Sequence, residues 1–322
     1  MGGALNVLVT GGAGFIGSEF VHQLVEQNEH TVTVIDAFTY AGNENNLSDV
    51  IGQIKIIEAN ISNEKLVRQI FNRNRFNLVV HFAAESHVDK SIISPKKFIV
   101  SNVDGTFNLL EAMNKEQVEK FIYVSTDEVY GSLESVIADE HSVLAPSSPY
   151  SASKASGEHL THAYGKTFGL NYKIVRCSNN YGKRQYPEKL IPLTIKKFIQ
   201  NKRVPIYGTG NNIREWLHVS DCAQAIALVA FQESENHIFN IGSGDYHTNL
   251  SVVSQIAEHM GIDYDFIEFV SDRKGHDFRY AINSDLIRKT FSWEPRITFS
   301  EGIKLTIDWY LNQVNFLNGL KK

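Results

Sequence analysis

The sequence predicts an α/β protein: a doubly wound parallel sheet joined to a smaller C-terminal α/β lobe. Three observations predict this fold. In the first half of the chain, short runs rich in β-branched residues alternate with stretches of helical periodicity. A glycine-rich turn joins the first run to the first helical stretch. After about residue 178 the alternation gives way to shorter elements separated by turn signals.

The elements of the first half follow one another as strand and helix. Apolar residues at helical spacing, such as Phe20, Val21, Leu24 and Val25, mark the stretches between the strands. Connections of this kind place helices on both faces of a parallel sheet. The predicted strands are residues 6–10, 31–36, 55–59, 77–84, 120–125 and 172–176.

The chain is expected to divide at about residue 178. Residues 1–178 form the predicted Rossmann-type sheet domain, and residues 179–322 form the second lobe. A strand-like segment near residues 237–242 is expected to return to the sheet. The chain then crosses between the lobes more than once.

Composition narrows the class of protein. The 322 residues are 43% hydrophobic and carry a formal charge of −5, which argues against a general affinity for nucleic acid or anionic membranes. The two cysteines, Cys177 and Cys222, suggest neither a disulfide framework nor a zinc site. No apolar run is long enough to span a bilayer. We therefore expect a cytoplasmic protein without a metal.

A dinucleotide site is predicted at the first strand. Gly11, Gly14 and Gly17 allow a tight turn, a close approach of the backbone to a pyrophosphate and close packing of the next helix. Asp36 ends the second strand, where a carboxylate accepts hydrogen bonds from both ribose hydroxyls and repels a 2′-phosphate. The pattern favours NAD over NADP, and makes the sheet domain the NAD-binding domain.

A phenol and an ammonium stand four residues apart in YSASK at residues 150–154. In a helix, Tyr150 and Lys154 share one face, and a nearby ammonium favours the phenolate. We therefore expect Lys154 to lower the pKa of Tyr150 and make it a general base. Ser125 and Thr126 at a strand end complete the pattern.

Together these features resemble the extended short-chain dehydrogenase/reductase family. Finer motifs narrow the resemblance: DAFTYAGN at 36–43, HFAAESHVD at 81–89, STDEVYG at 125–131, RCSNNYG at 176–182 and RKGHD at 273–277. These motifs resemble the dTDP-glucose 4,6-dehydratase branch of the family. That resemblance implies a cytoplasmic NAD-dependent lyase of deoxysugar and cell-surface polysaccharide biosynthesis, with dTDP-glucose as substrate.

An acid pair distinguishes a dehydratase from an epimerase of the same family. Once C4 of the hexose is a ketone, elimination of water needs one group to take the C5 proton and another to protonate the leaving 6-hydroxyl. The resemblance makes Glu128 this base and Asp127 this acid. Burial and mutual repulsion can keep one of the two protonated. The catalytic set is then Thr126, Asp127, Glu128, Tyr150 and Lys154.

The resemblance also implies binding residues. Those for NAD are Gly11, Gly14, Phe15, Ile16, Gly17, Asp36, Asn60, Ile61, Phe82, Ala83, Ala84, Ser101, Tyr150, Lys154 and Asn180. Those for the nucleotide sugar are Ser86, Thr126, Asn179, Lys189, Leu190, Pro205, Ile206, Tyr207, Arg214, Asn249, Arg273 and His276, the second lobe being the nucleotide-sugar lobe. Helices around residues 95–113 and 149–168 are implied to pair across a two-fold axis, making a homodimer.

The chain departs from the family pattern at two motifs and one connection. Asn60 replaces an aspartate near the adenine, and Lys274 replaces a proline after Arg273. The connection from Glu128 to Tyr150 is also short. Alternatives stay open: a UDP-sugar 4,6-dehydratase, an epimerase or decarboxylase of the same family, or a non-catalytic NAD sensor.

Overall fold

Seven parallel strands form the central sheet in a computed structural model that describes residues 3–263, 265 and 267–319. Their order across the sheet is β10-β6-β5-β4-β1-β2-β3, and every neighbouring pair is parallel. The doubly wound parallel sheet is confirmed. The strands are β1 (Asn6–Thr10), β2 (Thr31–Asp36), β3 (Lys55–Glu58), β4 (Leu78–His81), β5 (Lys120–Thr126), β6 (Asn171–Cys177) and β10 (Ile238–Ile241).

The strands follow the sequence pattern closely because most are buried on both faces and read as nearly continuous β-branched runs. β4 is the exception, because it ends at His81 although an apolar run was expected to continue to residue 84. Phe82, Ala83 and Ala84 instead line a cavity. Their apolar character serves that cavity wall and not the sheet.

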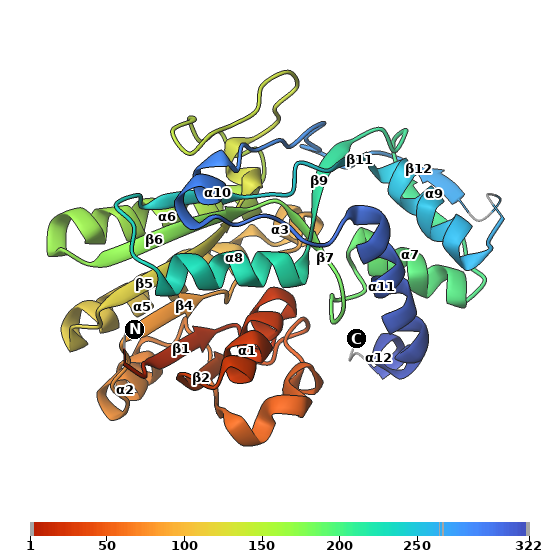
Figure 1. Cartoon of the computed structure of the whole chain (residues 1–322). Coiled ribbons are helices and arrows are strands. Elements are labelled where there is room, and N and C mark those ends of the chain that lie inside the picture. The colour runs from red at the N-terminus through yellow and green to blue at the C-terminus, as the bar shows by residue number, and fades with distance from the viewer. Residues whose placement is uncertain (1–2, 264, 266, 320–322) are drawn as a thin grey trace.

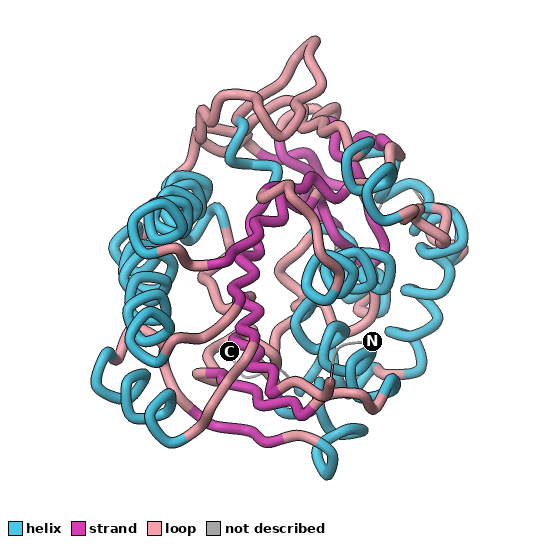
Figure 2. The backbone as a smooth tube through the Cα atoms, turned by 60° about the vertical axis from the view of Figure 1, so that its left-hand side comes forward, coloured by secondary structure: helices cyan, strands magenta, loops and turns pink. Residues whose placement is uncertain are grey.

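Helices cover both faces of the sheet (Figures 1 and 2). One hydrophobic core joins the sheet to α1, α8 and α10 through residues such as Phe20, Ile226 and Ile287. A second core, on the opposite face, joins it to α2, α5 and α6 through residues such as Val67 and Leu109. These helices and the adjoining 3-10 helix are α1 (Phe15–Gln27), η1 (Glu44–Gln53), α8 (Val219–Phe231), α10 (Asp285–Phe291), α2 (Glu64–Arg73), α5 (Gly105–Glu116) and α6 (Pro149–Phe168).

Short helical segments connect the strands to the longer helices near the carboxyl edge of the sheet. A π-helical segment, η2 (Ile99–Asp104), runs directly into α5. Asn102 of η2 donates to Ser153 Oγ of α6 at 2.9 Å, which ties this connection to α6. The other segments are α3 (Val88–Ile93), α4 (Pro95–Phe98) and η3 (Asp127–Tyr130).

A smaller lobe contains most of the second half of the chain (Figure 1). Its core includes Tyr181, Ile195, Ile256 and Ile307. β10 leaves this lobe to pair with β6; the domain division at residue 178 stays a prediction. The elements are β7 (Asn179–Tyr181), β8 (Val204–Tyr207), β9 (Ile213–His218), β11 (Tyr246–Thr248), β12 (Ile267–Val270), α7 (Leu190–Ile199), α9 (Asn249–Met260), α11 (Phe299–Asn312) and α12 (Val314–Gly319).

The described residues contain neither a candidate membrane span nor a cluster of metal-ligating side chains. None of the helices in that part of the chain is both long and apolar enough to cross a membrane. No group of three or more His, Cys, Asp or Glu side chains among those residues is placed to hold a metal ion.

Candidate active site

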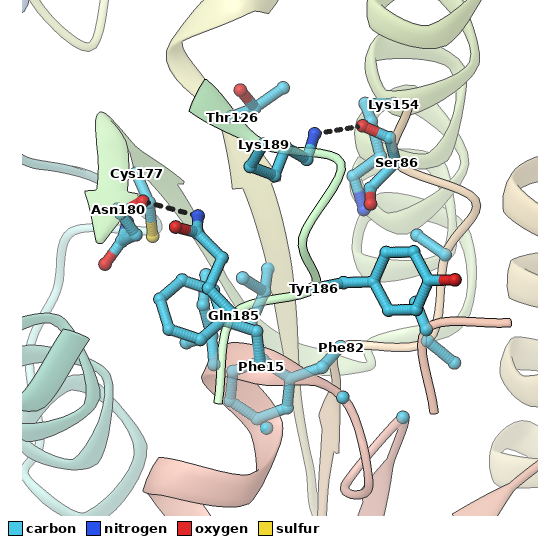
Figure 3. A pocket seen from close by; sticks show the side chains of 18 of the residues that line it. Phe15, Phe82, Ser86, Thr126, Lys154, Cys177, Asn180, Gln185, Tyr186 and Lys189 are labelled. Atoms are coloured by element: carbon cyan, nitrogen blue, oxygen red, sulfur yellow. Dashed lines mark hydrogen bonds between the residues drawn. The ribbon is translucent and has the colours of Figure 1, made fainter. Parts of the chain in front are cut away.

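A cavity of about 300 Å³ opens at the carboxyl ends of the central strands, where doubly wound folds bind their ligands. It extends from the glycine turn after β1 to the end of β6 and the segment before α7 (Figure 3). The structure brings most of the expected site residues to its wall: Gly11, Gly14, Phe15, Ile16, Gly17, Asp36, Phe82, Ala83, Ala84, Ser86, Thr126, Asp127, Glu128, Tyr150, Lys154, Asn179, Asn180 and Lys189.

The glycine turn after β1 brings the backbone of Gly11 close to the backbone of Ala83. Gly11 has φ +70°, and a Cβ there would lie 2.5 Å from the backbone nitrogen of Ala83, so a larger residue would not fit. Gly14 is the N-cap of α1 and supplies no side chain to the free N–H groups of the first turn. The start of α1 therefore offers N–H donors to an anionic group, as a pyrophosphate requires.

Asp36 ends β2 at the opposite side of this turn. Its Oδ2 accepts from the Ala13 N–H at 3.0 Å, and its Oδ1 accepts from the Phe38 N–H at 2.9 Å. Burial raises the pKa of Asp36, and these backbone hydrogen bonds oppose that rise. Two carboxylate oxygens have about four acceptor positions, so the group can still accept hydroxyl donors from a ligand.

The acid pair follows the end of β5. Thr126 is the N-cap of η3: its Oγ1 accepts from the Glu128 N–H at 3.3 Å and lies 3.2 Å from Asp127 Oδ1. Asp127 is 2% exposed, and burial, with the charges of Glu128 and Glu215, raises its pKa well above the usual range. This environment favours the protonated form of Asp127.

Glu128 has a different environment. Burial raises its pKa too, but the positive charges of Lys189, Arg273 and Arg214 oppose the rise. Three cations thus favour the carboxylate at Glu128, whereas carboxylates dominate around Asp127. Two neighbouring carboxyls in environments of opposite charge are suited to act as one acid and one base.

The phenol and the ammonium lie on α6, and both are buried. Burial and the charge of Glu128 raise the pKa of Tyr150, and hydrogen bonding with Thr126 only partly opposes them. The expectation that Lys154 lowers this pKa is therefore wrong for the protein alone. The Lys154 ammonium lies 4.3 Å from the centre of the Tyr123 ring, and burial lowers its own pKa to about 8.

Several buried polar atoms of the cavity wall have no hydrogen-bond partner within the described part of the chain. Such atoms are costly unless a ligand or water satisfies them. They are Ser125 Oγ, Asp127 Oδ2, Ser178 Oγ, Asn180 Oδ1 and Gln185 Oε1. A polar ligand in the cavity would provide these partners.

Three residues implied for NAD binding do not line the cavity. Asn60 is exposed, and its side-chain oxygen accepts from the N–H and hydroxyl of Ser62 at 2.9 and 2.8 Å. Ile61 is 4% exposed and packs in the core against α2 and α5. Ser101 is partly buried within η2. Their part in binding stays a prediction.

A second group of expected residues meets around Asp89, outside the cavity wall. Arg273 Nη1 lies 3.2 Å from Asp89 Oδ1, and the Tyr207 hydroxyl donates to Asp89 Oδ2 at 3.1 Å. The His276 ring meets the Tyr207 ring edge-on, and its Nδ1 lies 2.6 Å from Asp272 Oδ1. The structure thus brings Arg273, Tyr207 and His276 together. Asp89 was missed, although it ends one of the quoted motifs.

Backbone carbonyl groups hold the guanidinium of Arg214 in place. Its guanidinium donates to the carbonyls of Ile213, Phe278 and Asp277 at 2.8, 3.2 and 2.9 Å and lies 4.3 Å from the centre of the Tyr280 ring. Most of its donors are therefore already used. The remaining expected residues stand at element positions: Leu190 begins α7, Asn249 begins α9, and Pro205 and the buried Ile206 lie in β8.

Tyr280, Ser178 and Gln185 were missed. The Tyr280 hydroxyl lies 3.5 Å from Glu128 Oε2 and donates to Asp277 Oδ2 at 2.6 Å, although 152 residues separate Tyr280 from Glu128 in the chain. No local sequence signal marks it. Ser178 stands inside a quoted motif at a strand end, a position that could have revealed it.

Comparisons with known proteins agree with this geometry. A family model described as GDP-mannose 4,6 dehydratase matches residues 8–306. A dTDP-glucose 4,6-dehydratase of Streptomyces antibioticus is 43% identical over 324 residues, which cover 99% of this chain and 96% of that protein. The crystal structure of DesIV, a dTDP-glucose 4,6-dehydratase from Streptomyces venezuelae with NAD bound, is 40% identical with a TM-score of 0.95 and covers 98% of this chain and 100% of that chain. A UDP-glucose 4-epimerase from Thermotoga maritima is 31% identical with a TM-score of 0.91 and covers 96% and 100%.

Proposed function

The chain belongs to the GDP-mannose 4,6 dehydratase family of extended short-chain dehydrogenases/reductases, and on that premise we propose that it is an NAD-dependent dTDP-glucose 4,6-dehydratase. The proposed reaction oxidises the hexose at C4, eliminates water across C5 and C6, and returns the hydride to C6. The product is dTDP-4-keto-6-deoxyglucose, a precursor of deoxysugars for cell-surface polysaccharide.

One observation carries the proposal. Asp127 and Glu128 stand side by side in the wall of the same cavity as Tyr150, with environments that favour an acid at one and a base at the other. A 4-epimerase needs only oxidation and reduction at C4 and has no use for such a pair. The pair therefore favours dehydration over epimerisation.

The cavity wall fits NAD. The uncapped start of α1 suits the pyrophosphate, Asp36 suits the ribose hydroxyls, and the unpartnered Asn180 Oδ1 suits the carboxamide of the nicotinamide. When bound, NAD supplies the electron sink that accepts the hydride from C4 and returns it to C6.

Tyr150 and Thr126 act at C4 in the proposed mechanism. Thr126 and the Tyr150 phenol both face the 4-hydroxyl, and Tyr150 takes its proton as C4 is oxidised. Burial disfavours the phenolate, so the oxidation needs positive charge nearby. Lys154 supplies it below pH about 8, where its ammonium is charged.

Glu128 and Asp127 act on the ketone. Glu128 takes the C5 proton, and Asp127 gives its proton to the leaving 6-hydroxyl, which departs as water. Glu128 then returns its proton to C5 as the hydride reaches C6. The proton held by Tyr150 is released and Asp127 is reprotonated, so the net change is the loss of one water.

The test is an incubation of the purified protein with dTDP-glucose and, separately, with UDP-glucose, followed by mass spectrometry. We expect the dTDP-sugar to lose the mass of one water and the UDP-sugar to react far more slowly. Equal or faster dehydration of UDP-glucose would identify a UDP-sugar dehydratase. A mass unchanged with both would contradict the dehydratase proposal.

We also propose a homodimer in the cytoplasm. Ile93, Ile99, Phe107 and Phe168 are exposed by 83, 45, 43 and 53% on the helical segments around α5 and α6. These apolar side chains support pairing of the two helices with a second copy. Two buried free thiols, Cys177 and Cys222, suit a reducing compartment.

A further inference from the structure

A short segment crosses the cavity between the sheet domain and the second lobe. Residues 182–189, here called the strap, connect β7 to α7. Four strap residues line the cavity: Gln185, Tyr186, Glu188 and Lys189. In Figure 3 the Gln185 side chain extends toward Asn180, the Tyr186 ring points to the other side of the strap, and Phe15 and Phe82 lie below them. The strap thus covers the part of the cavity assigned to NAD.

The strap is tied to the second lobe at its centre. The Tyr310 hydroxyl of α11 donates to the Gln185 carbonyl at 2.6 Å. Gln185 Nε2 donates to the Asn180 carbonyl of β7 at 2.9 Å. These two hydrogen bonds fix the strap to the lobe that carries it, and they do not close it onto the sheet domain.

Several contacts close the far end of the strap onto the sheet domain, among them His87 Nε2 at 3.7 Å from Glu188 Oε2 and an edge-on meeting of the Tyr40 and Tyr186 rings. Lys90 Nζ lies 2.6 Å from Glu188 Oε2, and Lys189 Nζ donates to the Ser86 carbonyl at 2.8 Å. Ser86 and Lys189 are themselves among the residues assigned to the sugar. Changes there would affect substrate binding and cofactor release together.

The near end of the strap is closed by one carboxylate. Glu19 of α1 is 5% exposed, and its Oε2 lies 3.2 Å from Lys183 Nζ and 3.0 Å from Arg184 Nη1. Its Oε1 accepts from the Ser220 hydroxyl of α8 at 2.7 Å. Burial alone would raise the pKa of Glu19, but Lys183, Ser220 and Arg184 bring it below the usual value. Glu19 is therefore ionised, and Lys183 and Arg184 are both paired with it.

The backbone of the strap favours release of this contact. Arg184 has φ +67°, in the left-handed region that arginine rarely adopts. Such conformations persist where surrounding contacts hold them. Two charge-assisted contacts to a largely buried carboxylate provide that hold, because partial burial reduces their screening by water and salt.

We propose that Glu19, Lys183 and Arg184 form a latch that keeps the strap closed over NAD and sets the rate at which the cofactor leaves. The inference rests on the proposed NAD-dependent function. A cofactor that regains its original state in every cycle need not leave between turnovers, so a closed strap does not slow the reaction. The three residues are positioning residues, since none touches the reacting atoms.

The main test compares Glu19→Gln with the unmodified protein. Gln keeps the size of the side chain and an acceptor for Ser220 but removes the charge. Bound NAD should exchange with excess isotopically labelled NAD roughly 10- to 100-fold faster, the loss typical of charge-assisted hydrogen bonds. The turnover rate at saturating NAD should stay within about twofold. Mass spectrometry of quenched samples measures the exchange.

Two further variants separate the latch from a general effect on Glu19. Arg184→Asn removes one cation and should also speed the exchange of bound NAD. Asparagine tolerates the left-handed backbone at this position. Ser220→Ala removes the other hydrogen bond to Glu19 without touching the strap, and should leave the rate unchanged. Exchange at the unmodified rate in both Glu19→Gln and Arg184→Asn would overturn the proposal.

Lys183 and Arg184 are also trypsin sites, which gives a readout that needs no cofactor. In NAD-free protein, Glu19→Gln should speed cleavage after these residues, because the strap opens more often. If the unmodified protein binds no NAD, the proposed function fails and this measurement alone decides the latch. Unchanged cleavage in Glu19→Gln would then overturn it.

Discussion

Replacing Glu128 by Gln separates oxidation from elimination. Burial raises the pKa of Glu128, and Lys189, Arg273 and Arg214 oppose that rise by favouring the carboxylate. The substitution removes this proposed base. General acid–base catalysis contributes roughly 10²–10⁴-fold, and water loss should fall by that factor. The Tyr150 phenol and NAD stay in place, and loss of the Glu128 charge removes one cause of the raised pKa of Tyr150, so oxidation at C4 should continue.

The assay is a single turnover with enzyme in excess over dTDP-glucose. Absorbance of the reduced nicotinamide follows oxidation, and mass spectrometry of quenched samples follows water loss. In Glu128→Gln the absorbance should rise and persist, because the hydride cannot return to C6 before elimination. Asp127→Asn should behave similarly, since an amide is a far poorer proton donor than the protonated carboxyl. Dehydration by Glu128→Gln at the unmodified rate would refute the assignment of the pair.

Four other predictions concern Tyr150, Lys154, Asp36 and the oligomeric state. Tyr150→Phe should reduce oxidation and dehydration together by roughly 10²–10⁴-fold in the same assay. Lys154→Met should abolish activity yet stabilise the NAD-free protein. The pKa of Lys154 is about 8 in the folded protein and 10.5 in the unfolded chain, so the free energy of unfolding at pH 7, measured with urea, should rise by about 3 kcal/mol. Below pH about 8 Lys154 is charged in both the folded and the unfolded protein, and burying the charge destabilises the fold by the full amount. Between pH about 8 and 10.5 Lys154 is charged only in the unfolded chain, so the stabilisation by Met shrinks as the pH rises. Asp36→Ala should weaken NAD binding by about tenfold or more and reduce the ratio of the affinity for NAD to the affinity for NADP, both measured by titration calorimetry. Light scattering at micromolar concentration should give the mass of a dimer, and a monomer mass would contradict the proposed pairing of α5 and α6.

The sheet could be predicted because its strands carry their own signal. β1 and β2 match the expected bounds residue for residue. The same signal fails at residues 82–84, where apolar side chains line the cavity after β4 has ended. Apolar character predicts burial, and only the tertiary structure distinguishes burial in a sheet from a place in a cavity wall.

The site could be predicted where its residues lie in motifs at strand ends, as Asp127 and Glu128 do. Contacts between residues that lie far apart in the sequence could not be predicted. Glu19 and Arg184 are 165 residues apart, and neither stood out in the sequence. The expected fall in the pKa of Tyr150 was wrong for a related reason, because the sequence shows the neighbouring Lys154 but not the burial and the Glu128 charge that raise this pKa.

The fate of the hydrogen at C4 distinguishes a dehydratase from an epimerase and from a simple dehydrogenase. The purified protein is incubated with dTDP-glucose that carries deuterium at C4, and the product is analysed by NMR. We expect deuterium at C6 of a 4-keto-6-deoxy product, with no net reduction of NAD. Deuterium returned to C4, or accumulated in reduced cofactor in proportion to product, would contradict this expectation and identify an epimerase or a simple dehydrogenase instead.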